Sequence, residues 1–224
     1  MTISQYLVPT VSAAAAMVPT YYGFAVKSAQ QLDKTIPRFV PLEAIKNGLK
    51  LAPTAGLIVG TQMIAEKWIG KQLGAENSLL KSLASAAIVG LISAPLLAAF
   101  NGQTMGRSIS ESILALSMRE AAAITAKETI FVVSLGASSK VSQIMKRYFG
   151  DNMATEYAGA FVSGAIGSIV GHPFDTMLTR WQAGLPCKAI HLMKGATAKA
   201  LAVGSFSMFY NMGKGFLTSS LVKT

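Results

Sequence analysis

The sequence contains little that could support redox, metal or nucleophilic chemistry. Cys187 is its single cysteine, which excludes an intrachain disulfide, and with only His172 and His191 it cannot complete a metal site of the usual ligand number. No phosphate loop of the GxxxxGK[ST] type occurs, and no nucleophile can be named beside a base and an orienting carboxylate. These absences predict a protein that is not an enzyme and that has neither a metal site nor a cofactor.

Charged residues are also scarce. They make up 13% of the 224 residues, whereas a soluble domain carries about 25%, and hydrophobic residues make up 51%. Three segments contain no Asp, Glu, Lys or Arg: residues 1–26, 82–106 and 157–174. A helix needs about 20 mostly apolar residues to cross a bilayer, so we expect membrane spans in these segments. A large soluble helical protein could bury such segments, but three of them in so short a chain disfavour that alternative.

Acidic residues are outnumbered two to one, with ten against twenty basic residues and a net charge of +10. The basic residues lie mainly between the apolar segments, where they suit anionic lipid head groups. They do not gather into one patch, so nucleic acid is not an expected partner. Basic residues occur on both prospective sides of the membrane, and the positive-inside rule therefore predicts no orientation.

The pattern of long apolar segments and the breaks between them predicts helices only. Strand-like alternation is absent, and the hydrophobic segments are too long for barrel strands, which leaves a helical bundle as the spanning architecture. Proline and glycine breaks predict helices near residues 5–31, 45–72, 78–103, 118–148, 152–183 and 193–221. The uncharged cores of the even-numbered helices are shorter, as expected for helices that line a polar cavity.

Prolines recur at a nearly constant interval. Pro19, Pro95 and Pro173 each follow an apolar stretch and stand 76 and 78 residues apart. This period predicts one transmembrane domain, residues 1–224, made of three two-helix repeats, residues 1–74, 75–150 and 151–224. A proline inside a helix removes a hydrogen bond and kinks it, so the three prolines should bend the odd-numbered helices toward a common axis.

The clearest motif lies in residues 159–182, where a glycine-spaced apolar helix runs into Pro173, Asp175, Arg180 and Gln182. It resembles an odd-numbered helix of the mitochondrial carrier family, in which each proline opens the pattern Pro-x-Asp/Glu-x-x-Lys/Arg-x-Lys/Arg-x-Gln. In that family the acid and base pair between neighbouring helices and close the matrix side. The resemblance implies the same gate here, with kinks at Pro19, Pro95 and Pro173. Uncharged residues replace the other acids and bases of this gate: Tyr21, Phe24, Leu97, Phe100 and Leu178.

The even-numbered helices carry the second half of the resemblance. By the family's register, the substrate contacts near the bilayer midplane are Lys50, Arg119 with Glu120, and Lys199. The Arg-Glu pair is similar to that of carriers of amino acids and S-adenosylmethionine, because a guanidinium can bind a carboxylate bidentately while a glutamate faces an amino group. The lysines would also suit other carboxylates. Alternatively, these residues snorkel to an interface or pair with one another.

Two further sites follow from the resemblance. Tyr210, Asn211 and Lys214 in the last helix resemble the cytoplasmic gate, with an amide in place of the acid. Lys194 and Gly195 are similar to the family's cardiolipin site, with methionine in place of the aromatic residue, and a helix N-terminus favours anions. Membrane lipid is therefore an expected partner.

Two functions remain open from the sequence. The first is a short carrier of the inner mitochondrial membrane that alternates access around Lys50, Arg119, Glu120 and Lys199 to move a small metabolite. The second is a carrier-derived, transport-inactive structural or accessory subunit of a respiratory or ATP synthase complex. Costly intramembrane charges favour the first function. The loss of charge from both gates favours the second, because alternating access needs bonds that form on one side as they break on the other.

Overall fold

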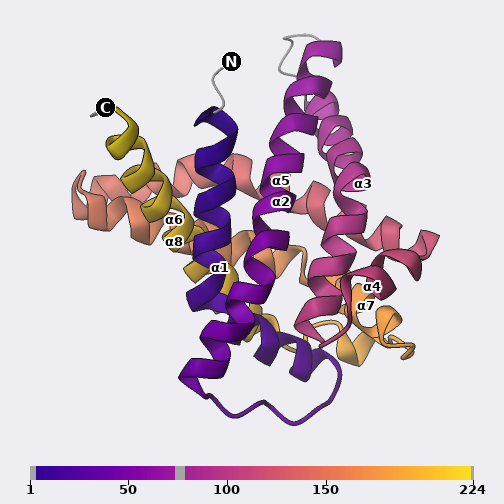
Figure 1. Cartoon of the computed structure of the whole chain (residues 1–224). Helices are drawn as coiled ribbons and strands as arrows, with labels where there is room; N and C mark the ends of the chain where they lie inside the picture. Colours follow the sequence, from indigo (N-terminus) through magenta and orange to yellow (C-terminus); the bar gives the residue numbers. More distant parts are fainter. Residues whose placement is uncertain (1–3, 74–78, 223–224) are drawn as a thin grey trace.

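The computed structural model describes the backbone of residues 4–73 and 79–222, and the side chains in these ranges except those of 4, 73, 79, 131–140, 142, 221 and 222. Within these ranges the regular elements are helices and no strand occurs. The all-helical prediction is therefore confirmed for the described chain. In chain order the elements are α1 (Ser4–Gln31), α2 (Pro41–Leu73), α3 (Leu79–Thr104), α4 (Ile109–Leu114), α5 (Met118–Phe149), α6 (Met153–Val170), α7 (His172–Gln182), the 3-10 helix η1 (Ala189–His191) and α8 (Ala196–Val222) (Figure 1).

The predicted helix ranges agree with the observed ones within a few residues, with one correction. Residues 152–183 form two helices, α6 and α7, which meet at Gly171. Pro173 therefore does not kink a continuous helix but stands in the first turn of α7, where its missing N–H costs no hydrogen bond. Pro19 and Pro95 lie inside α1 and α3, as expected. The predicted break at residues 74–77, with the boundary between the first two repeats, lies outside the described residues.

The long helices form a closed ring. α1 packs on α2, α2 on α3, α3 on α5, α5 on α6, α6 on α8, and α8 returns to α1. Figure 1 shows α1, α2 and α3 side by side, with α5 and α6 crossing behind them. α7 continues from α6 and contacts α5, α1 and α3, so it lies at the end of the ring where the chain passes from α1 to α2.

Glycines allow these helices to approach one another closely. A Cβ at Gly48 of α2 would lie 2.7 Å from the carbonyl oxygen of Val18 in α1, and a Cβ at Gly23 of α1 would lie 2.8 Å from the Cβ of Ala202 in α8. Both distances are shorter than any normal contact. Helix pairs that pack with so little between their backbones depend on small residues, as they do in membranes.

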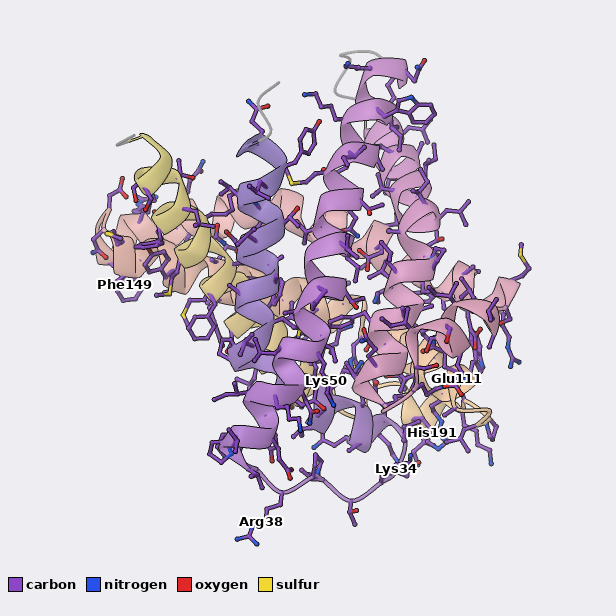
Figure 2. All side chains as sticks on the ribbon, in the orientation of Figure 1. Lys34, Arg38, Lys50, Glu111, Phe149 and His191 are labelled. Carbon is purple, nitrogen blue, oxygen red and sulfur yellow. The ribbon has the colours of Figure 1, made fainter. Side chains whose placement is uncertain are left out.

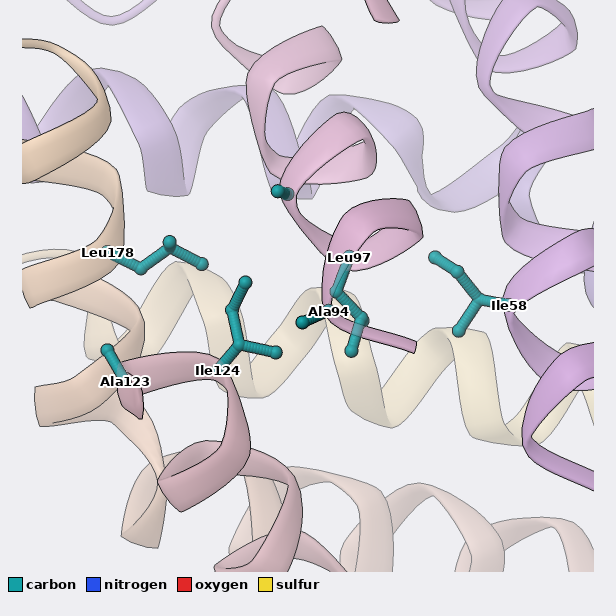
Figure 3. Close-up of a cluster of buried hydrophobic side chains, with 7 residues drawn as sticks. Ile58, Ala94, Leu97, Ala123, Ile124 and Leu178 are labelled. Atoms are coloured by element: carbon teal, nitrogen blue, oxygen red, sulfur yellow. The ribbon is translucent and has the colours of Figure 1, made fainter. Parts of the chain in front are cut away.

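The two larger apolar clusters among the described residues fill spaces between the helices. One joins α2, α3, α5 and α7 (Figure 3). Its buried members are Ile58, Ala94, Leu97, Ala98, Ala123, Ile124 and Leu178. The other joins α1, α2 and α8 around Met17 and Phe24. Leu97 and Leu178, which occupy acid and base positions of the predicted gate, thus form part of an apolar core.

By length and apolar composition alone, one helix within the described residues could cross a membrane, namely Leu80–Thr104 in α3. Six membrane spans in three pseudo-symmetric repeats therefore stay a prediction.

Candidate functional site

A partly open cavity of about 210 Å³ lies between the helices of the ring. Side chains from α1, α2, α3, α5, α6, α7 and α8 line it, half of them apolar and half polar or charged. Phe24, Phe100 and Phe206 contribute aromatic rings to this wall. The charged residues that line it are Lys27, Lys127, Glu128, Asp175 and Lys199. These five charges come from four helices that are far apart in the sequence, so the folded ring is what brings them together.

Asp175 is the centre of the charged group. Its carboxylate is buried, with 5% of the side chain exposed, and Oδ2 lies 3.0 Å from Nζ of Lys27. Gln31 donates a hydrogen bond of 3.1 Å to the same oxygen. Nζ of Lys127 lies 3.5 Å from Oδ1, and Nζ of Lys199 lies 3.6 Å from Oδ2. One carboxylate of α7 therefore joins lysines of α1, α5 and α8, and a buried carboxylate needs such partners.

Asn101 connects this group to α3. Its Oδ1 accepts a hydrogen bond of 3.1 Å from Lys27, and its Nδ2 donates one of 2.8 Å to Oε1 of Gln182. The amide of Gln182 in turn donates to the carbonyl oxygen of Ala98 at 3.1 Å. Gln182 thus holds the end of α7 against α3.

Ser28 and Thr104 add a direct bond between α1 and α3, with their hydroxyl oxygens 2.8 Å apart. Together with Gln182, these residues stand nine positions after Pro19, Pro95 and Pro173 respectively. The polar bonds that close this end of the ring thus include residues at equal distances from the three prolines.

Arg180 makes its bonds outside the cavity. Its guanidinium lies 2.9 Å from the carboxylate of Asp33, in the loop after α1, and donates to the carbonyl oxygens of Gln31 and Pro186. Lys194 also pairs with Asp33. The hydrogen bond from Lys194, and to a lesser extent the one from Arg180, lower the pKa of Asp33, because both stabilise the carboxylate. These pairs connect the loop after α1 to α7 and to the segment between η1 and α8.

His172 has a packing role in this region. Its side chain is buried, and its Nε2 lies 2.9 Å from the carbonyl oxygen of Lys194. It therefore links the start of α7 to the segment before α8.

Comparisons with protein-family models and with curated proteins give no match for this chain. The resemblance to mitochondrial carriers therefore stays a prediction from the sequence motifs.

The structure does not bring the four predicted substrate contacts together. Lys199 lines the cavity, whereas Lys50 is exposed on α2, near the loop from α1 (Figure 2). Arg119 is exposed, and its guanidinium stacks over the ring of Trp181 at 5.3 Å. Glu120 is the third residue of α5 and accepts a hydrogen bond of 2.7 Å from the backbone N–H of Ser117, which makes it part of a helix cap.

Two cavity lysines were not among the predicted contacts, Lys27 and Lys127. Lys27 directly follows the first uncharged segment and lies within the predicted helix 5–31. Lys127 stands about two turns after Arg119, since a helix has 3.6 residues per turn. A charge placed inside a predicted span was the available signal for both residues.

The predicted cytoplasmic gate residues make contacts within α8. The ring of Tyr210 stacks on Phe206, Nζ of Lys214 lies 5.4 Å from the Tyr210 ring, and Asn211 donates to the carbonyl oxygen of Ser207. At the other end of α8, Gly195 has a φ of +82° and faces the carbonyl oxygen of Lys27. Lys194 is engaged with Asp33, as described above. The gate and cardiolipin roles stay predictions.

Proposed function

We propose that this chain is a membrane carrier, similar to mitochondrial carriers, that moves a small metabolite across the inner mitochondrial membrane through the central cavity. The observation that carries the proposal is a ring of helices, closed in chain order, around a cavity with a buried cluster of charges. Three two-helix repeats in succession account for such a ring. In addition, polar residues at equal distances from the three prolines meet at one end of it.

The distribution of side chains supports a membrane setting. Five charged residues line the cavity inside the ring, while large apolar side chains on several helices are exposed outside it. Examples are Leu7, Leu57, Leu91, Ile166, Leu201 and Phe216, each more than 48% exposed. Lipid would cover these side chains, whereas water would leave them exposed at a cost in free energy.

Helix length agrees with six spans. α1, α2, α3, α5 and α8 contain 26 to 33 residues each, and α6 is followed directly by α7. At a rise of about 1.5 Å per residue, the five single helices exceed the roughly 30 Å of a bilayer's hydrocarbon core. We propose that these helices and the α6–α7 pair are the six spans.

The Asp175 cluster is suited to act as a gate. It joins α1, α5, α7 and α8 at the end of the cavity where the loop after α1 lies, so breaking its ion pairs would free four segments of the ring from one another. Alternating access requires one such closure to break while another forms on the opposite side. Among the proposed substrates, amino acids and other carboxylates fit the cavity because lysines line it.

Exchange by the purified protein in cardiolipin-containing liposomes tests the proposal. Amino acids, S-adenosylmethionine, carboxylates and nucleotides are loaded inside and offered outside as labelled solutes. We expect uptake of at least one carboxylate, and at least a tenfold lower rate for Lys199→Gln, since a hydrogen bond to a charged group contributes about 1.5–3 kcal/mol. Lys46→Gln removes the same charge from an exposed position of α2 and should leave the rate unchanged. Failure to exchange any of these solutes would refute the carrier proposal.

A second candidate is a transport-inactive subunit of a respiratory or ATP synthase complex. The observation in its favour is the apolar character of the gate positions. The rings of Phe24 and Phe100 pack edge to face with centroids 5.5 Å apart, and Leu97 and Leu178 belong to the apolar core. These apolar contacts would hold the ring closed. Stoichiometric co-purification with a large complex, together with no exchange in liposomes, would favour this function.

A further inference from the structure

We infer that the cavity binds a small organic monoanion whose carboxylate lies between Lys127 and Lys199 and whose apolar body packs against the phenylalanine wall. The inference rests on the proposed role of the cavity as a binding site. It adds the charge and the polarity of the molecule that the cavity takes.

The charge balance of the cavity indicates a single negative charge. Among the described residues that line it, three lysines face two carboxylates, those of Asp175 and Glu128. One positive charge is therefore left without a counter-charge. Uncompensated charge is costly in a buried site of low dielectric constant. A monoanion cancels this excess, whereas a dianion reverses it and a cation increases it.

Distances identify which lysines are able to bind the ligand. Lys27 is engaged, because it lies 3.0 Å from Asp175 and 3.1 Å from Asn101. Lys127 and Lys199 lie 3.5 and 3.6 Å from Asp175, beyond the 2.7–2.9 Å that is typical of a charge-assisted hydrogen bond. Each ammonium has three donors. A carboxylate can therefore bind to these two residues without displacing Lys27 from Asp175.

Glu128 also leaves the ammonium of Lys127 available to bind the ligand. Its Oε1 is 3.6 Å from Nζ of Lys127, while its Oε2 accepts a hydrogen bond of 3.0 Å from Gln62 of α2. The carboxylate is thus held mainly by the opposite helix.

The rest of the cavity suits an apolar body. Phe24, Phe100, Phe206, Ile58 and Val203 line it, and the amide groups of Asn101 and Gln62 are engaged with protein partners. The hydroxyl groups of a polyhydroxylated ligand would find no hydrogen-bond partners there, which costs about 1–3 kcal/mol for each hydroxyl. An aliphatic or aromatic chain would instead gain from the burial of apolar surface.

Three probes with the same six-carbon chain separate charge from shape: hexanoate, hexanamide and hexanedioate. Each is titrated by calorimetry into the purified full chain in detergent, with empty micelles as the blank. We expect hexanoate to bind at least about tenfold more tightly than the neutral amide and the dianion. Lys127→Gln and Lys199→Gln should each weaken hexanoate binding at least about tenfold, and Lys46→Gln should not change it.

A second measurement does not depend on the variants. Hexanoate should raise the unfolding temperature of the unsubstituted protein more than hexanamide does, because a ligand stabilises the state that it binds. Equal binding of hexanoate and hexanedioate or hexanamide would overturn the inference, and so would a Lys46→Gln effect as large as that of Lys199→Gln.

The outcomes also separate this inference from the carrier proposal. Hexanoate binding without exchange of any solute in liposomes would support the inference and refute the carrier. Exchange of a cation or a dianion, with no binding of hexanoate, would support the carrier and refute the inference.

Discussion

Replacing Asp175 with asparagine tests the central role of its carboxylate. Asparagine keeps the shape of the side chain and an acceptor oxygen for Gln31, but it removes the charge. Lys27, Lys127 and Lys199, all within 3.6 Å of the carboxylate, would then face one another without their shared counter-charge. Removing one partner of a buried ion pair costs about 3–5 kcal/mol, because the remaining charge stays buried and unpaired.

Thermal unfolding in detergent, followed by tryptophan fluorescence, measures this cost. For a chain of 150–250 residues, 1 kcal/mol corresponds to about 2–4 °C, so we expect Asp175→Asn to lower the midpoint by roughly 6–20 °C. Asp151→Asn is the matched control. Asp151 pairs with Lys146 at 2.8 Å, but 76% of its side chain is exposed. Surface pairs contribute about 0–1 kcal/mol, so this variant should shift the midpoint by less than about 4 °C.

A double variant makes the reasoning refutable. Adding Lys27→Gln to Asp175→Asn removes one of the unpaired charges and should restore part of the lost stability, a non-additive result expected for residues in contact. If Asp175→Asn shifts the midpoint no more than Asp151→Asn does, or if the second substitution adds fully to the first, Asp175 does not compensate the lysines.

Three further predictions concern stability and use the same unfolding assay. Gly48→Ala should destabilise the protein by about 1–3 kcal/mol, because the new Cβ would meet the backbone of α1, whereas Gly70→Ala, with nothing within 4 Å, should be neutral or stabilising; equal effects would contradict the close packing. Ser117→Ala should cost about 0.5–2 kcal/mol because it removes the cap of α5, and no change would mean that the cap is not needed. Because the pKa of Asp33 is lowered in the folded protein, its carboxylate stabilises the fold above the unfolded pKa of about 3.9, and this stability is lost as the pH falls through the folded pKa. Asp33→Asn should therefore make the unfolding midpoint less dependent on pH below about pH 4.

Much of the helical fold could be predicted because its signals are local. Uncharged segments and the glycine and proline breaks between them locate the long helices within a few residues. The division of one expected helix at Gly171 could not be predicted, because an apolar glycine-containing segment reads the same whether its helix continues or stops. The short helix α4 was also missed, since its six residues are too few to show a period.

The candidate site was predicted only in part, for a geometric reason. Lys199, a predicted substrate contact, and Asp175, a predicted gate residue, both line the cavity, but their roles stay predictions. Lys50 does not line it, because Lys50 is exposed while its neighbour Leu51 is buried. Successive residues of a helix differ by about 100° in direction, so a register that is wrong by one position exchanges an inward side chain for an outward one.

The pairing of Lys27 with Asp175 has a consequence for biosynthesis, because 148 positions separate the two residues. At about 5–20 residues per second, a ribosome adds Asp175 roughly 7–30 s after Lys27. Throughout that interval the nascent α1 carries a lysine whose counter-ion has not yet been synthesised. If α1 spans a membrane as proposed, its lysine has to stay hydrated until α7 is complete, so the insertion of α1 and the synthesis of α7 would depend on each other.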